Sequence, residues 1–274
     1  MACVFLACRR LELLIVAKTS SDGRFRTWGK LRKLNSESTD SLALSSITPL
    51  LKPLFSPVAE FSWLGGQNVP KTGPALIVAN HVSSLDPVLL GLFLAHQGRW
   101  PHFLARANLW DNKLLRKILN SSRQIPVHRG TAQAADSLTA AIESLERGDL
   151  VIIYPEGTIT FDPQEWPMTI RSGAARLALT TGVKVIPVGQ WGANYILPPR
   201  KIRKPNLRRR EVRAVAGKPI DFSGLVSEQP SGEQIAQASN RILQAILKQT
   251  SEARREPAPR DVWDHRIKQR VAIR

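Results

Sequence analysis

The chain has 274 residues, 43% of them hydrophobic, which is enough for one substantial domain with tails or at most two small domains. Its 39 lysines and arginines against 22 acidic residues give a formal net charge of +17, which predicts attraction to nucleic acid, to an anionic membrane surface or to phosphorylated substrates. The two cysteines, Cys3 and Cys8, stand near the start of the chain, which argues against a disulfide framework and a thiolate nucleophile.

The first 66 residues divide into two stretches. We expect residues 1–40 to be a disordered extension, because their apolar beginning is interrupted by charges, fits neither a secretory signal nor a membrane span, and leads into a polar, serine-rich linker. Residues 41–66 carry few charges, but prolines recur every four positions, at Pro49, Pro53 and Pro57, which a straight transmembrane helix tolerates badly. This stretch predicts a kinked, interfacial helical segment or a segment that packs on the domain, and both interpretations stay open.

Alternating strand and helix patterns follow. Apolar, β-branched runs predict buried strands at 74–80, 149–155, 183–189 and 211–217. Helical patterns at 83–98, 134–149 and 171–182 lie between them, and an amphipathic helix is expected over 232–250. Strands that alternate with helices of this length predict an α/β fold with a largely parallel sheet flanked by helices, over residues 67–250. Residues 251–274 are basic, and we expect a loose tail there.

The stretch "VANHVSSLDPVLL", residues 78–90, places His81 and Asp86 five positions apart where the first strand ends. On one continuous α-helix, these two side chains would point about 140° apart. Pro87 favours a strand, a short turn and then a helix with the proline in its first turn. In such a turn Asp86 can accept the Nδ1–H of His81, which leaves Nε2 as a base. The alternative is that Asp86 only caps the helix.

Other polar residues follow the later strands, where open α/β sheets place their sites. "QIPVHR" brings Arg129, and "YPEGT" brings Glu156 and Gly157 directly after the second long strand. The chain lacks G-x-G-x-x-G after a strand, Walker A, G-x-S-x-G and H-E-x-x-H sequences, which weakens dinucleotide, nucleotide-hydrolysis, serine-esterase and zinc-protease interpretations.

Together with "VIPV" in the third strand, these blocks resemble, in order and spacing, the glycerolipid acyltransferases of the 1-acylglycerol-3-phosphate O-acyltransferase type, over roughly residues 48–225. The resemblance implies that His81 is the general base and Asp86 its orienting partner. It implies that Arg129 holds the glycerol phosphate and that Glu156 and Gly157 serve the acceptor.

The chain departs from this family at three basic positions. Arg106 and Arg171 stand where the family often has lysine, so both are candidate substrate-binding residues with a different donor geometry. Arg123 stands near a position that is usually glycine.

The run "RKIRKPNLRRREVR", residues 200–213, has eight basic residues and one acid, and it is either a solvated loop or a surface for anionic lipid head groups or coenzyme A phosphates. A nucleic-acid partner is disfavoured, because aromatic side chains are not interleaved with the charges. The resemblance implies an acyltransferase that moves a fatty acyl chain from acyl-CoA or acyl carrier protein to 1-acylglycerol-3-phosphate (lysophosphatidic acid), giving phosphatidic acid.

We expect this enzyme to work without a metal or other cofactor, at the cytoplasmic face of the cell membrane. Two alternatives remain: an acyltransferase for another acceptor, such as glycerol-3-phosphate or a different lysophospholipid, and a non-enzymatic protein that binds anionic lipid or nucleic acid.

Overall fold

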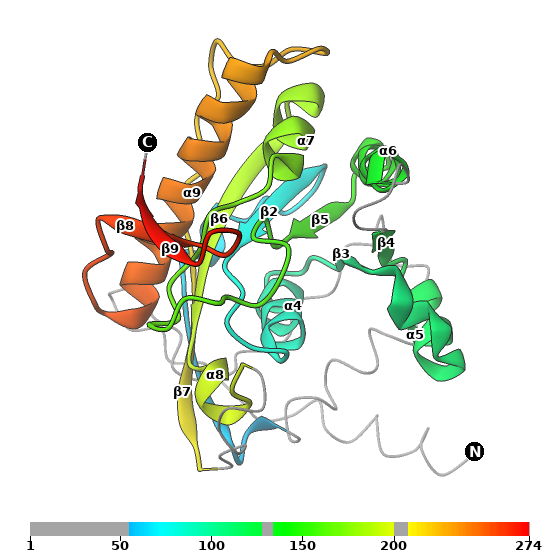
Figure 1. Ribbon diagram of the computed structural model, residues 1–274. Helices are drawn as coiled ribbons and strands as arrows, with labels where there is room; N and C mark the ends of the chain where they lie inside the picture. The colour runs from blue at the N-terminus through cyan, green and yellow to red at the C-terminus, as the bar shows by residue number, and fades with distance from the viewer. Residues whose placement is uncertain (1–54, 128–133, 200–207, 274) are drawn as a thin grey trace, which may run out of the picture.

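The computed structural model describes residues 55–127, 134–199 and 208–273. In the described part, seven strands form one sheet in the order β1-β7-β6-β2-β5-β3-β4 (Figure 1). Their bounds are β1 Ala59–Leu64, β2 Ala75–Ala79, β3 Pro101–Arg106, β4 Ile125–Val127, β5 Leu150–Ile153, β6 Lys184–Trp191 and β7 Arg210–Ala216. All neighbours are parallel except β6 and β7, which run antiparallel.

Helices cover both faces of this sheet. The helices of the described ranges are α4 Asp86–His96, α5 Lys113–Ser121, α6 Ala134–Glu146, α7 Gly173–Thr181, the short α8 Ala193–Ile196 and the long α9 Gly232–Arg254, with 3-10 turns η2 Gly66–Asn68 and η3 Ala107–Asp111. Of these, α5 stands at the β4 edge of the sheet (Figure 1). The side chains of β2 alternate between the two faces. Ile77 belongs to a core cluster with α4, whereas Leu76 and Val78 belong to a cluster with α6, α7 and α9. Burial on both faces explains why β2 is an uninterrupted apolar run.

The close approach of α9 to the sheet depends on a glycine in β6. A Cβ atom on Gly189 would lie 2.1 Å from the backbone carbonyl carbon of Gln249 in α9. Only a residue without a side chain fits there, so this glycine lets the long helix pack directly against the central strands.

The predicted α/β fold, with a largely parallel sheet flanked by helices, is confirmed, and all four predicted strands are present as β2, β5, β6 and β7. Part of the stretch expected as an interfacial or packing segment, Ala59–Leu64, forms β1 and pairs with β7, so these residues pack on the domain. Residues 41–54 and the extension at 1–40 lie outside the described residues.

The C-terminal stretch differs from the loose tail expected from its composition. Beyond α9, the strands β8 (Asp261–Asp264) and β9 (Gln269–Ala272) form an antiparallel hairpin. Val262 is buried in a small cluster with residues of α9, so the hairpin packs on the domain. Among the helices of the described ranges, none combines the length and apolar character needed to cross a bilayer.

Candidate active site

The candidate site begins where β2 ends, at a turn that is hydrogen-bonded to β6. Asn80 donates its side-chain amide to the carbonyl of Gln190 at 3.0 Å and accepts the Gln190 N–H at 2.7 Å, and the Gln190 side chain donates to the Asn80 carbonyl at 3.0 Å. Both residues are buried. This reciprocal set of bonds holds the backbone that carries His81.

The side chains of His81 and Asp86 meet in the turn, as the sequence predicts. His81 Nδ1 lies 2.8 Å from Asp86 Oδ2, which also accepts the backbone N–H groups of Val82 at 2.6 Å and Ser83 at 2.7 Å. Asp86 is fully buried and is the first residue of α4, with Pro87 next, and its side chain accepts from His81, Val82 and Ser83, which lie ahead of that helix. When the hydrogen is on Nδ1, His81 donates it to this carboxyl oxygen, and Nε2 is then the basic nitrogen.

The ring of Tyr154 stacks on the face of the His81 imidazole. The two rings are stacked with centroids 4.2 Å apart and planes inclined by 17°. Burial, with a further contribution from the Asp86 carboxylate, holds the pKa of Tyr154 well above its usual value, so the hydroxyl stays protonated. Sequence reasoning missed this contact. The available signal was an aromatic residue at the end of a buried strand, immediately before the "PEGT" turn.

Glu156 is buried behind the same turn. Its Oε1 accepts the backbone N–H of His81 and its Oε2 accepts that of Met168, both at 3.0 Å. Burial raises the pKa of Glu156 to about 8, against the opposing effect of these two hydrogen bonds. The side chain therefore ties the His81 turn to the loop that follows β5, and both its oxygens are already engaged by the protein.

Three backbone N–H groups of the turn are already hydrogen-bonded to the carboxyl groups of Asp86 and Glu156. The N–H groups of His81, Val82 and Ser83 point to Glu156 and Asp86. They are therefore not available to stabilise an oxyanion on a substrate.

His81 and Tyr154 form part of the wall of a large apolar groove with a volume of 1420 Å³. Its lining comes from α4, β3, η3, α5, α6 and the loop after β5, and includes Leu92, Phe103, Leu104, Leu119, Leu138 and Ile153. Among the described residues, His81 Nε2 has no hydrogen-bond partner, so the basic nitrogen is available at this wall.

Three arginines also line the groove: Arg106 at the end of β3, Arg171, and Arg176 in α7. Arg171 lies across Gly157, where a Cβ atom would be 2.8 Å from its Nε. Because Gly157 also has a φ of +75°, a side chain at this position would be strained and would displace Arg171. Arg176 was not predicted from the sequence. Arg129 lies outside the described residues, so its predicted role stays a prediction.

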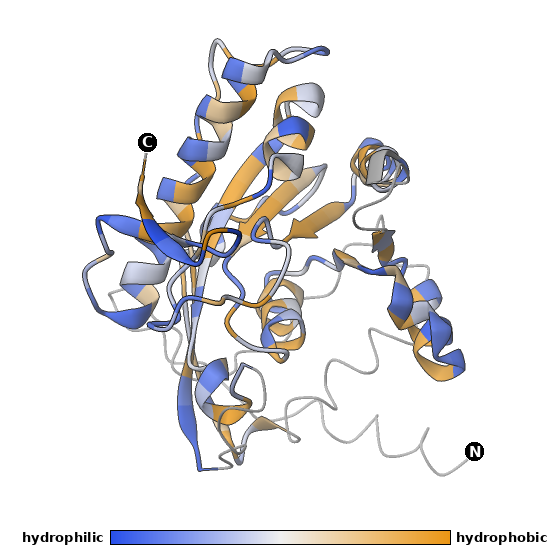
Figure 2. Ribbon diagram, in the orientation of Figure 1, coloured by the Kyte–Doolittle hydropathy of each residue, from blue (hydrophilic) through white to orange (hydrophobic). Residues whose placement is uncertain are grey.

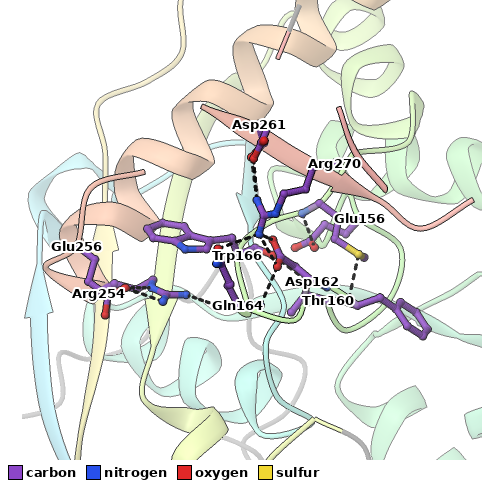
Figure 3. Close-up of polar contacts among 11 residues, drawn as sticks. Glu156, Thr160, Asp162, Gln164, Trp166, Arg254, Glu256, Asp261 and Arg270 are labelled. Carbon is purple, nitrogen blue, oxygen red and sulfur yellow. Dashed lines mark hydrogen bonds and ion pairs between the residues drawn. The ribbon is translucent and has the colours of Figure 1, made fainter. Parts of the chain in front are cut away.

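The C-terminal segments hold the loop between Gly157 and Met168 in place (Figure 3). The Nη2 atom of Arg270 in β9 lies 2.7 Å from both carboxylate oxygens of the buried Asp162. Arg254 at the end of α9 stacks on Trp166, with its guanidinium carbon 4.0 Å from the ring centroid, and donates to the carbonyl of Gln164 at 2.8 Å.

This loop is also bonded to the turn that carries His81. The N–H of Thr160 donates to the carbonyl of His81 at 2.8 Å.

In the described ranges, no group of three or more histidine, cysteine, aspartate or glutamate side chains is arranged to hold a metal ion.

Comparison with known proteins places this arrangement in context. Residues 63–191 match a protein-family model described as Acyltransferase. A chloroplastic 1-acyl-sn-glycerol-3-phosphate acyltransferase, LPAT1 of Arabidopsis thaliana, is 29% identical over 162 residues, which are 58% of this chain and 43% of that protein. The chain thus spans less than half the length of this relative.

A 1-acyl-sn-glycerol-3-phosphate acyltransferase of Bacillus subtilis (strain 168) is 24% identical over 184 residues, covering 66% of this chain and 83% of that protein. Among solved structures, the 1-acyl-sn-glycerophosphate (LPA) acyltransferase PlsC from Thermotoga maritima matches with a TM-score of 0.58 and 24% identity, over 75% of this chain and 78% of that chain. At that identity, the structural match shows a shared fold.

Proposed function

We propose that this protein transfers a fatty acyl chain to the free hydroxyl of 1-acylglycerol-3-phosphate and so forms phosphatidic acid. The match of residues 63–191 to a family model described as Acyltransferase supports the reaction class. The relatives named for this reaction support the choice of acceptor. The acyl donor in our proposal is a thioester, either acyl-CoA or acyl carrier protein. No metal or other cofactor is required, because the thioester already activates the acyl group.

The observation that carries the proposal is the His81–Asp86 pair, with Nδ1 2.8 Å from Oδ2, in the wall of a large apolar groove. His81 Nε2 takes the proton of the acceptor hydroxyl while that oxygen attacks the thioester carbonyl carbon. The tetrahedral intermediate then collapses, the C–S bond breaks, and the departing sulfur takes the proton back from the imidazolium. Asp86 stabilises the imidazolium during these steps, and Tyr154 keeps the ring in one orientation.

The groove supplies what the two lipid substrates need. Its apolar lining suits a fatty acyl chain, since each buried CH₂ group contributes about 0.8 kcal/mol. Arg106 and Arg171 on the same lining can pair with the acceptor phosphate, because a guanidinium group donates two parallel hydrogen bonds to phosphate oxygens. Glu156 acts here as a positioning residue rather than as a ligand for the acceptor, since both its oxygens accept backbone N–H groups.

The test is formation of phosphatidic acid from 1-acylglycerol-3-phosphate and labelled oleoyl-CoA, or oleoyl-acyl carrier protein, by the purified full chain in detergent or lipid. His81→Ala should abolish product formation, whereas Lys248→Ala, which removes an exposed cation of α9 outside the groove lining, should leave it unchanged. Equal turnover by wild type and His81→Ala would refute the role of this base. Product with a different lysophospholipid or with glycerol-3-phosphate, and none with 1-acylglycerol-3-phosphate, would refute the proposed acceptor.

The cations can be tested by their effect on acceptor binding. We expect Arg171→Gln to raise the KM for 1-acylglycerol-3-phosphate by about 10-fold with a smaller change in kcat, as for the loss of a charge-assisted hydrogen bond. Arg266→Gln, at an exposed arginine of the hairpin, is the matched control. An unchanged KM in Arg171→Gln would place the phosphate elsewhere.

A further inference from the structure

The segment formed by η3 and α5 exposes an unusual amount of apolar surface. Four of its side chains are exposed large hydrophobic residues: Leu109, Leu114, Leu115 and Ile118, of which Leu114 is 69% exposed. Neither η3 nor α5 contains a buried residue. The helix stands at the β4 edge of the sheet, on the side of the molecule away from α9 (Figure 1). Contiguous exposed apolar surface of this kind marks an interaction site.

The helix is amphipathic, with one apolar and one basic face. At 100° per residue, Leu114, Leu115, Ile118 and Leu119 fall within an arc of about 140°. Lys113, Arg116 and Lys117 fall on the opposite side, and α5 contains no acidic residue. Figure 2 shows the two kinds of residue alternating along α5. An apolar stripe bordered by cations fits an anionic bilayer surface, in which the stripe enters the head-group boundary and the cations meet lipid phosphates.

The exposed helix is held in shape by its own polar contacts. Asn112 caps it by accepting the N–H groups of Leu114 at 3.0 Å and Leu115 at 3.1 Å. Trp110 in η3 donates its indole N–H to Asn120 at 2.7 Å, which ties η3 to the last turn of α5. A nine-residue helix is marginal in water by itself, so these contacts preserve a face that makes few contacts with the rest of the domain.

This face is continuous with the groove of the candidate active site. Leu109 and Ile118 are both exposed and part of the groove lining, as is Val88 of α4. The half-buried Leu119 also lines the groove. The η3–α5 segment is therefore the rim of the cavity into which a long-chain lipid must pass, and an apolar path leads from the exposed stripe to the wall that carries His81.

We propose that the η3–α5 segment, residues 107–121, docks the protein on the surface of an anionic bilayer and delivers lipid from that surface to the groove. The delivery of lipid to the groove rests on the proposed function, whereas binding to the bilayer can be measured in the absence of any reaction. Leu114, Leu115, Lys113 and Lys117 are absent from the groove lining, so substitutions there separate docking from catalysis.

The experiment is co-sedimentation of the full chain with vesicles of phosphatidylcholine alone or mixed with phosphatidylglycerol. We expect Leu114→Asp to lower partitioning onto the mixed vesicles by at least tenfold. Ile267→Asp, which alters a residue 56% exposed in the C-terminal hairpin, should bind like wild type. We expect Lys113→Gln and Lys117→Gln each to lower binding to mixed vesicles about fivefold at low salt, and to leave binding to pure phosphatidylcholine unchanged. A folded Leu114→Asp variant that binds like wild type would overturn the proposal.

Two further readouts identify what covers the stripe and separate docking from the reaction. With Cys3 and Cys8 replaced by serine, an environment-sensitive fluorophore on Leu114→Cys should shift to shorter wavelength when mixed vesicles are added. A signal already shifted before vesicles are present would mean that another part of the chain or a second copy covers the face, and would overturn the proposal.

With a short-chain, monomeric acceptor, Leu114→Asp should keep the kcat/KM of wild type, whereas its rate on vesicle-borne acceptor should fall with binding. Equal losses on both acceptors would also overturn the proposal, and inactivity of wild type with every acceptor would bear on the proposed function alone.

Discussion

Replacing Arg270 by methionine removes one side of a buried ion pair, and Arg270 lies far along the chain from the turn that carries His81. Arg270 Nη2 lies 2.7 Å from each oxygen of Asp162, whose side chain is fully buried, and Arg270 itself is 24% exposed. Asp162 belongs to the loop whose Thr160 N–H binds the His81 carbonyl. The substitution keeps an unbranched side chain of similar reach but leaves the carboxylate without its cation.

Removing one partner of a buried pair costs about 3–5 kcal/mol, because an uncompensated charge remains in the interior. Two features of this site reduce the cost. Asp162 Oδ1 still accepts the N–H of Gln164 at 2.8 Å, and the partial exposure of Arg270 gives water a route to the vacated place. We therefore expect Arg270→Met to lower the free energy of unfolding by about 2–3 kcal/mol. In a domain of this size, that corresponds to a decrease in Tm of roughly 4–12 °C.

Urea and thermal unfolding of the full chain measure this loss, and the kcat for acyl transfer measures its effect on the loop. Arg209→Met is the matched control, since Arg209 and its partner Glu60 are 62% and 50% exposed and their pair, at 3.9 Å, should contribute at most about 1 kcal/mol. In the double variant Asp162→Asn/Arg270→Met, no buried charge is left unpaired, so part of the lost stability should return. A folded Arg270→Met variant within about 0.5 kcal/mol of wild type, with unchanged kcat, would refute the reasoning.

Four further substitutions test the site and its supports. Asp86→Asn should lower kcat by about 10²–10⁴-fold, because the amide still accepts the Nδ1–H but does not stabilise an imidazolium; a loss below tenfold in steady-state assays would contradict this. Tyr154→Leu should lower kcat while Tyr154→Phe stays near wild type, since the stacking needs the ring and not the hydroxyl; equal kcat values for the two variants would argue against it. Glu156 has a pKa of about 8 in the folded protein against an ordinary 4.5, so between these values the folded state binds more protons than the unfolded state and stability falls as pH rises. Urea unfolding across that pH range should show a shallower fall in Glu156→Gln, and an unchanged slope would count against the assignment. Arg123 has a left-handed φ of +50°, so Arg123→Gly should raise the free energy of unfolding by roughly 0.5–1 kcal/mol in the same assay, and a decrease would show that its side-chain contacts outweigh the strain.

The position of Arg123 shows how a sequence pattern acquires its physical meaning from the fold. The family resemblance placed a glycine near this position, without a reason. In the structure, Arg123 follows the last turn of α5 and adopts the left-handed conformation that commonly ends a helix and that glycine adopts without strain. An arginine in this conformation therefore carries a local cost in stability that a glycine would not.

The sequence by itself determined the features that depend on neighbouring residues. Apolar runs and helical spacing predicted four strands of the sheet and the helices between them, because burial on both faces of a parallel sheet leaves a direct pattern. The turn in which Asp86 meets His81 was also predictable, since both residues and Pro87 lie within seven positions and the proline restricts the backbone. The ordered blocks of the chain then sufficed to recognise the acyltransferase family.

The tertiary structure alone decided which distant residues meet. The spacing of apolar residues predicts which face of a helix or strand is apolar, but it does not predict which other element packs against that face. The stacking of Tyr154 on His81, the bonds of Glu156 to two backbone N–H groups, and the pair of Asp162 with Arg270 each join segments that are remote in sequence or depend on the strand order. The basic composition after α9 predicted a loose tail, whereas its alternating residues pair into a hairpin because Val262 finds a buried site against α9. The exposure of the apolar stripe on α5 has the same origin, because only the arrangement of the elements leaves that face without a covering partner in the described part of the chain.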